Sequence, residues 1–212
     1  MIPFVCPYHK VILANGAFPR HQVPLSFLHK ATQIICCDGA AERLLEFNLE
    51  PDHIVGDLDS LSQKLQQRYQ HCLHDDSDQE TNDLTKAVNF CIQRQWNEIT
   101  ILGATGKRED HTLGNISLLA DYAKYTNIQM ITDYGVFFPL LKSEHFESYA
   151  GQQVSIFSLT PDSVFTLQGL KYPLMNQHLS MWWQGTLNEA VGSDFFVEMD
   201  FGKALVFRQH QI

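Results

Sequence analysis

The stretch DLTKAVNFCIQRQWNEITILG, residues 83–103, decides the fold because a helix-type pattern leads directly into a strand-type pattern. Between residues 83 and 95 the apolar side chains recur every three or four positions, which is typical of a helix with one apolar stripe: Leu84, Ala87, Val88, Cys91 and Ile92. The run Ile99–Leu102 then stops at Gly103, as a buried strand does before a loop. This succession predicts an α/β fold.

The same alternation extends outward over the first two-thirds of the chain. Four further short apolar runs each stop at a polar or glycine-containing loop: Val11–Ala14, Ile34–Cys37, Ile54–Val55 and Ile128–Ile131. A second helical pattern follows Asp110, with apolar residues at 113, 116, 120 and 123. We therefore expect residues 1–143 to form a mostly parallel sheet with helices on both faces. Ligands of such sheets collect at the carboxyl ends of the strands.

The pattern changes after Ser143. Four β-rich segments are separated by turn residues rather than by helices: Gln153–Leu159, Val164–Leu167, Phe195–Phe201 and Ala204–Phe207. Residues 144–212 are therefore predicted to form an antiparallel β domain, with the boundary between Leu141 and Gly151.

Charge and composition narrow the class of protein. A net charge of −9 argues against a nucleic-acid binder or an anionic-membrane binder, since both need a surplus of Lys and Arg. No apolar run approaches the ~18 residues of a membrane span, and Met1–Pro7 lacks the pattern of a secretory signal. The odd number of cysteines, without a C-x-x-C pair, is typical of reduced core thiols in a cytoplasmic protein: Cys6, Cys36, Cys37, Cys72 and Cys91.

The sharpest chemical feature is Gly56-Asp57-Leu58-Asp59-Ser60, directly after a predicted strand. In an extended chain the two-residue spacing points the Asp57 and Asp59 carboxylates to the same side. Two adjacent carboxylates repel unless a cation lies between them, and Mg²⁺ accepts carboxylates, waters and phosphate oxygens. The alternative is a solvated turn, where Asp, Gly and Ser are common.

Two further segments carry candidate phosphate-binding groups. Asp78–Asp83 precedes a helix that Thr81 or Asn82 would cap, and Lys86 lies one turn further on. An ordinary acidic helix start with a solvated lysine explains the same residues. Leu102–Thr112 contains a glycine turn between strand and helix, but it is not a Walker A loop, because Arg108 stands where Ser or Thr is required. Arg108 offers a planar fork for phosphate oxygens, and His111 fits an acid–base role as well as a helix-capping or surface role.

Together and in order, these segments resemble the motifs of the thiamin pyrophosphokinase family. The resemblance is carried by Cys37–Ala41, Gly56–Ser60, Asp78–Asp83, Gly106–His111, Gly169–Leu174 and Gly185–Glu189, and so it covers most of the chain. It implies an N-terminal nucleotide domain, a C-terminal thiamin-binding β domain, and a homodimer with thiamin near the subunit interface. The implied reaction transfers pyrophosphate from ATP to the thiamin hydroxyl, giving thiamin diphosphate and AMP.

The resemblance also implies roles for individual residues. Asp57, Asp59 and Asp83 would be the Mg²⁺-associated acids, and Asp59 or Asp83 would orient or deprotonate the hydroxyl. The groups near ATP and its phosphates would be Asp38, Gln79, Asn82, Lys86, Arg108, Asp110 and His111. Of these, Arg108 would be catalytic, stabilising with Lys86 the charge that develops during the transfer. On the thiamin side, Tyr172 is the first aromatic candidate, ahead of Trp182 and Trp183, and Asn188 lies in the second resembling segment.

This sequence departs from the family at two positions. Asn82 stands where Thr is usual, and Lys107 stands where a second Gly is common. Two other functions remain open at this point: a catalytically silent thiamin or nucleotide sensor, and a Mg²⁺-dependent phosphotransferase acting on another small alcohol.

Overall fold

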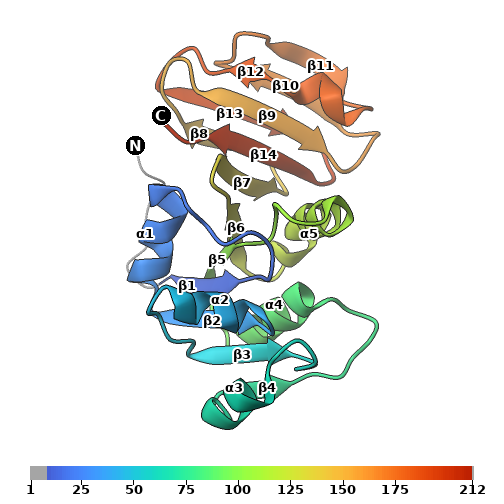
Figure 1. Cartoon of the computed structure of the whole chain (residues 1–212). Coiled ribbons are helices and arrows are strands. Elements are labelled where there is room, and N and C mark those ends of the chain that lie inside the picture. Colours follow the sequence, from blue (N-terminus) through green and yellow to red (C-terminus); the bar gives the residue numbers. More distant parts are fainter. Residues whose placement is uncertain (1–8, 212) are drawn as a thin grey trace. The chain divides into compact units, whose positions relative to one another are not determined.

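The computed structural model describes residues 9–211, which form two compact units (Figure 1). Residues 9–116 and 125–133 make an α/β unit, and residues 117–124 and 134–211 make a β-rich unit. Cys6, one of the predicted core thiols, lies outside the described residues. The other four cysteines are buried free thiols, as predicted.

The α/β unit contains a sheet of six parallel strands in the order β6-β5-β1-β2-β3-β4. The central strand β1 is buried along most of its length, and its Ile12 pairs with Ile35 on one side and Ile101 on the other. All five strands expected from apolar runs are present, whereas β4 was not predicted. The strands are β1 (Lys10–Leu13), β2 (Gln33–Cys37), β3 (His53–Gly56), β4 (Leu73–Asp75), β5 (Glu98–Leu102) and β6 (Asn127–Ile131).

Five helices connect these strands: α1 (Gln22–Lys30), α2 (Ala40–Glu46), α3 (Gln63–Arg68), α4 (Asp83–Gln93) and α5 (Glu109–Tyr122). The predicted helix at 83–95 is confirmed, and it ends at Gln93 because Gln95 adopts a left-handed conformation with φ of 59°. Asn82, rather than Thr81, is its N-cap. The chain moves from β1 toward β4 and then returns to β5, so right-handed crossovers place α4 on the face opposite α1 and α2.

The β-rich unit consists of two antiparallel sheets with the orders β12-β9-β14-β7 and β11-β10-β13-β8. Both sheets contribute to one apolar core, with Ile156 and Val206 from the first and Phe165 and Phe195 from the second. The strands are β7 (Gly135–Leu140), β8 (Glu144–Glu147), β9 (Gln153–Ser158), β10 (Val164–Gln168), β11 (Leu174–His178), β12 (Asn188–Glu189), β13 (Asp194–Met199) and β14 (Ala204–Gln209).

The antiparallel character of this unit was predicted correctly, but its helix-free character was not. A 3₁₀ helix, η1 (Trp182–Gly185), interrupts the strands and packs on β9. The predicted strand at 195–201 also stops earlier, at Met199. Among the described residues, no helix combines the length and the apolar character that a membrane crossing requires.

Candidate active site

Carboxylates gather where β2 and β3 end, at the carboxyl edge of the parallel sheet. Asp38 directly follows β2 and is only 2% exposed, while Asp57 and Asp59 follow β3. One oxygen from each of these three side chains lies within 4.8 Å of the other two. The predicted convergence of Asp57 and Asp59 is therefore present, and Asp38 joins them.

The local geometry differs from the extended chain that was expected. Leu58, between the two acids, has a left-handed φ of 63°, so the chain turns instead of continuing as a strand. The Asp57 carboxylate accepts a hydrogen bond from the Asp59 backbone N–H at 3.3 Å, which is typical of an Asx turn. The two carboxylates thus approach each other because of a turn, and not because of strand periodicity.

Asp38 anchors this turn through its side chain. Its Oδ2 accepts from the backbone N–H of Ser60 at 2.9 Å. Its Oδ1 is buried and has no hydrogen-bond partner among the described residues. Burial raises the pKa of the Asp38 carboxyl, and the neighbouring carboxylates of Asp83, Asp57 and Asp59 raise it further, against the Ser60 hydrogen bond. A buried carboxylate oxygen facing other carboxylates fits a site for a hard cation.

Gly56 allows a fourth acid to approach the other three. A Cβ atom at position 56 would lie 2.9 Å from the Asp38 Cβ and 3.4 Å from an Asp83 carboxylate oxygen. Asp83 occupies the first turn of α4, where the helix dipole favours a carboxylate. Glycine is therefore needed where Asp38 and Asp83 come together.

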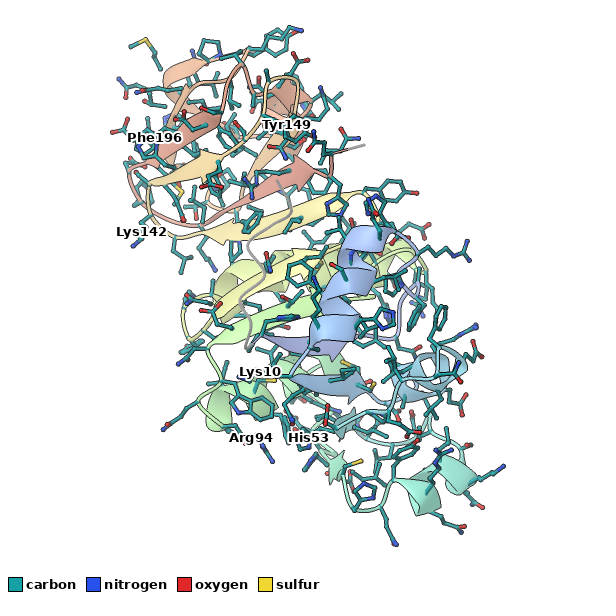
Figure 2. All side chains as sticks on the ribbon, turned by 90° about the vertical axis from the view of Figure 1, so that its left-hand side faces the viewer. Lys10, His53, Arg94, Lys142, Tyr149 and Phe196 are labelled. Atoms are coloured by element: carbon teal, nitrogen blue, oxygen red, sulfur yellow. The ribbon has the colours of Figure 1, made fainter. Side chains whose placement is uncertain are left out.

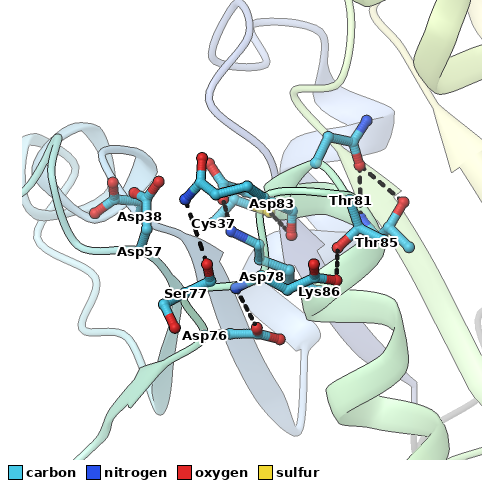
Figure 3. Close-up of polar contacts among 12 residues, drawn as sticks. Cys37, Asp38, Asp57, Asp76, Ser77, Asp78, Thr81, Asp83, Thr85 and Lys86 are labelled. Atoms are coloured by element: carbon cyan, nitrogen blue, oxygen red, sulfur yellow. Dashed lines mark hydrogen bonds and ion pairs between the residues drawn. The ribbon is translucent and has the colours of Figure 1, made fainter.

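Lys86 supplies a positive charge beside these acids (Figure 3). It is 3% exposed, and its ammonium lies 3.4 Å from an Asp83 carboxylate oxygen. Burial raises the pKa of Asp83, whereas the charge and hydrogen bond of Lys86 lower it. The alternative of a solvated lysine is wrong, because α4 directs this side chain inward.

The loop before α4 is held by its own hydrogen bonds, several of which Figure 3 shows. The Asp78 carboxylate accepts from the Glu80 backbone N–H at 2.9 Å and from the Thr81 hydroxyl at 3.1 Å. Gln79 donates to Ser77 O at 3.4 Å and is exposed. Asn82 accepts from the Thr85 backbone N–H at 2.9 Å, so its side chain caps the helix.

The glycine turn after β5 packs tightly on the turn after β1. Gly16 donates its backbone N–H to Gly103 O at 2.6 Å, and Lys107 donates its ammonium to Asn15 O at 2.9 Å. A Cβ on Gly16 would lie 2.3 Å from that same Gly103 carbonyl. Sequence reasoning did not mark Asn15, because an Asn-Gly pair after a strand is an ordinary turn signal. Lys107, one of the two departures from the family pattern, holds these loops together.

Arg108, Asp110 and His111 lie at the exposed start of α5 and are not part of the acidic group. Arg108 forms a two-bond ion pair with Asp110, with N–O distances of 2.5 and 3.1 Å. The hydrogen bond from Arg108, supported by the His111 backbone N–H, lowers the pKa of Asp110 to about 2. The guanidinium therefore already has a carboxylate partner, and a phosphate would have to compete with it. His111 is exposed.

The β-rich unit contains the candidates for binding an aromatic cation. The Asn188 side chain is buried and both accepts from the Tyr172 backbone N–H at 3.0 Å and donates to the Tyr172 carbonyl at 2.8 Å. Tyr172 is 60% exposed. Trp182 and Trp183 lie on η1 and are both exposed, at 46% and 73%. These two residues belong to a 3₁₀ turn in which neither indole is buried.

A parallel sheet with clustered acids at its carboxyl edge and a glycine turn nearby defines a class of protein that binds phosphorylated ligands with a metal ion. A family model described as the catalytic domain of thiamin pyrophosphokinase matches residues 25–132, and one described as its substrate-binding domain matches residues 135–207. The chain belongs to the thiamin pyrophosphokinase family, whose members are ATP-dependent pyrophosphoryl transferases.

The chain is also similar to individual thiamin pyrophosphokinases in sequence and in structure. Thiamine pyrophosphokinase of Bacillus subtilis is 30% identical over 183 residues, which cover 80% of this chain and 83% of the relative. The crystal structure of thiamin pyrophosphokinase from Geobacillus thermodenitrificans superposes with a TM-score of 0.78 at 26% identity, covering 96% of this chain and 98% of the other. The Bacillus subtilis crystal structure gives a TM-score of 0.80 at 24% identity, with coverages of 96% and 100%.

Proposed function

We propose that this protein transfers pyrophosphate from ATP to thiamin in a Mg²⁺-dependent reaction, giving thiamin diphosphate and AMP. The observation that carries the proposal is the convergence of Asp38, Asp57 and Asp59 within 4.8 Å, in a segment that matches the catalytic domain of the family. We assign nucleotide binding and catalysis to residues 1–143 and thiamin binding to residues 144–212.

The residues present fit a magnesium ion. The donor set is all oxygen, Asp38 Oδ1 is buried without a hydrogen-bond partner among the described residues, and the three carboxylates otherwise repel one another. Asp57 and Asp59 are the proposed ligands, with Asp83 associated and Asp38 beside them. When bound, Mg²⁺ supplies charge neutralisation at the phosphate oxygens of the nucleotide.

The protein side chains position the substrates and balance charge. Lys86 offsets the charge of Asp83, so the acids present less net negative charge to an incoming polyphosphate. We assign contacts with ATP or its phosphates to Gln79, Asn82, Arg108, Asp110 and His111. For Arg108 this requires exchanging its carboxylate partner for a phosphate, which its exposed position permits.

The acceptor hydroxyl of thiamin attacks the β-phosphorus of ATP, and the bond to the α-phosphate oxygen breaks to release AMP. Such a transfer depends mainly on alignment and charge stabilisation. Asp59 and Asp83 are the two candidates for orienting the hydroxyl and accepting its proton. Asp59 is exposed and accepts from the Ser60 hydroxyl at 2.9 Å, whereas Asp83 is held by Lys86.

For thiamin, we propose that the Tyr172 ring stacks on the cation, a contact worth about 0.5–2 kcal/mol. Asn188 sets the position of this ring through both backbone groups of Tyr172. We also propose a homodimer with thiamin near the subunit interface. The exposed apolar residues of the β-rich unit support an interface there, since such residues are enriched in protein contacts: Met175, Met181, Trp183 and Leu187.

One assay separates this function from its alternatives. Purified protein is incubated with ATP, Mg²⁺ and thiamin, and both AMP and thiamin diphosphate are quantified. We expect equal amounts of the two products, and no product from Asp57→Asn, which should fold normally. Binding of thiamin or ATP without AMP formation would indicate a sensor. AMP formation with other small alcohols but not with thiamin would indicate a different phosphotransferase.

A further inference from the structure

A single amide side chain, that of Gln66 in α3, connects that helix to the turn that carries Asp57 and Asp59. Its Nε2 donates to the carbonyl oxygens of both Leu58 and Leu61, at 2.9 Å each. A carbonyl oxygen only accepts hydrogen bonds, so both contacts require the NH₂ group of the amide and fix its orientation. Both hydrogens of this NH₂ group are thereby used on one turn.

The turn needs such support because its backbone is strained. Leu58 adopts a left-handed φ of 63°, a conformation that is unfavourable for a residue with a Cβ atom because that atom approaches the following carbonyl oxygen too closely. The backbone bond that closes the turn, from Leu61 N to Leu58 O, is long at 3.4 Å. Gln66 adds two shorter bonds across the same turn, and the buried Leu61 side chain anchors its end.

Resting on the metal site proposed above, we propose that Gln66 is a positioning residue for the cation. It holds the Leu58–Leu61 turn so that the Asp57 and Asp59 carboxylates stay beside Asp38. Without these two bonds, the turn is free to relax toward the right-handed region, and the Asp59 carboxylate then swings away from its neighbours. No sequence motif marks position 66, which lies in a short helix between Gln63 and Arg68.

The chain offers a matched control in the next residue. Gln67 is the same residue type in the same helix, but it is exposed. Gln66→Met removes the N–H donors while keeping a side chain of similar length, and Gln67→Met makes the same exchange without touching the turn. The cation probe is Mn²⁺ added alone, with free Mn²⁺ measured by electron paramagnetic resonance, so that the readout is independent of turnover.

Water partly replaces the two lost hydrogen bonds at this half-buried position, so we estimate about five- to tenfold weaker binding, which is about 1–1.4 kcal/mol. We expect Gln66→Met to weaken Mn²⁺ binding by that factor, whereas Gln67→Met binds like the wild type. Hydrogen exchange of the amides in residues 58–61 should accelerate in Gln66→Met, with thermal midpoints of the two variants within a few degrees.

The outcomes separate this inference from the proposed metal site. If the wild type and both variants bind Mn²⁺ equally well, Gln66 has no positioning role while the metal site stands. Faster exchange in Gln66→Met with unchanged Mn²⁺ affinity would likewise reduce Gln66 to a structural residue. If the wild type binds no Mn²⁺ at all, the metal assignment fails and the role of Gln66 fails with it.

Discussion

Asp38→Asn tests whether the acidic group is kept together at a cost in stability. Each pair of ionised carboxylates in this group has oxygens no more than 4.8 Å apart. At that separation, Coulomb repulsion is about 0.9 kcal/mol with a dielectric constant of ~80 and about 3.5 kcal/mol with ~20. Because Asp59 is exposed to water, we use the lower repulsion energy for both the Asp38–Asp57 pair and the Asp38–Asp59 pair. The total is then about 2 kcal/mol.

The substitution keeps the one hydrogen bond that Asp38 accepts. The carbonyl oxygen of the introduced amide takes the place of Oδ2 opposite the Ser60 N–H, and the new NH₂ group takes the place of the unpartnered Oδ1. At pH 8 without divalent cations, Asp38→Asn should therefore raise the stability of the protein by about 2 kcal/mol, or about 4–8 °C in its unfolding midpoint. The additional stabilisation by saturating Mg²⁺ should be smaller in the variant than in the wild type, because less carboxylate repulsion is left for the cation to relieve.

Differential scanning calorimetry with and without Mg²⁺ measures both quantities. Asp162→Asn is the matched control, because it removes the same charge from an exposed turn of the β-rich unit. A destabilised Asp38→Asn protein that still gains the full Mg²⁺ shift would refute the reasoning. It would mean that Asp38 is a structural carboxylate that takes no part in holding the cation.

Three further predictions concern other charged and hydrogen-bonded groups. Lys86→Met should bind Mn²⁺ about 2–5-fold more tightly than the wild type, because about 0.5–1 kcal/mol of repulsion between the lysine and the cation is removed. The variant should nevertheless turn over more slowly. An unchanged Mn²⁺ affinity in a titration would contradict the charge-balancing role. Asn188→Asp loses the bond donated to the Tyr172 carbonyl, so the KM for thiamin should rise about tenfold with little change in the KM for ATP; equal changes in both would argue against a thiamin-side role. Burial lowers the pKa of both His53 and His74, whose rings share a hydrogen bond, so the unfolded chain binds more protons and stability falls as the pH drops below about 6.5. His74→Gln should flatten that fall between pH 7 and pH 5 in thermal melts, and the exposed His29→Gln should not.

The histidine pair belongs to a cluster at the amino end of the sheet, away from the acids. Figure 2 labels His53, Arg94 and Lys10, which lie near one another in the α/β unit. The Arg94 guanidinium lies 3.4 Å from the Phe90 ring centroid. Burial is the main cause that lowers the pKa of His53, and the positive charge of Arg94 lowers it further. The negative charge of Asp52 opposes this shift. The predicted pH dependence is therefore one of stability, and it is separable from any pH dependence of turnover.

Sequence patterns predicted those elements whose burial is nearly complete. The strands β1, β2 and β5 are buried on both faces, so their apolar runs were visible without knowledge of the partner strands. β4 consists of only three residues, Leu-His-Asp, and β11 is mostly exposed, so neither carries a hydrophobic signal. Such strands form because a neighbour presents free backbone groups, which a single sequence does not reveal.

The candidate site was predictable in its residue types but not in its geometry. Asp57 and Asp59 were expected to converge through strand periodicity, whereas a left-handed Leu58 brings them together. The burial of Lys86 could not be predicted from the sequence, because a lysine one turn into an acidic helix is usually solvated. The ion pair between Arg108 and Asp110 was not predicted either, because two side chains this close in sequence meet only in a particular backbone conformation.

The four acids lie on three separate segments of the chain, which makes the site more specific than an acidic surface. Asp38 follows β2, Asp57 and Asp59 lie in the turn after β3, and Asp83 lies in the first turn of α4. These segments approach one another at Gly56, where a Cβ atom would collide with Asp38. Chance clustering on a solvated surface does not require a glycine, a buried carboxylate and a buried lysine together. The acids and their lysine support the proposed cation and phosphate sites, whereas thiamin as the acceptor rests on the family to which the chain belongs.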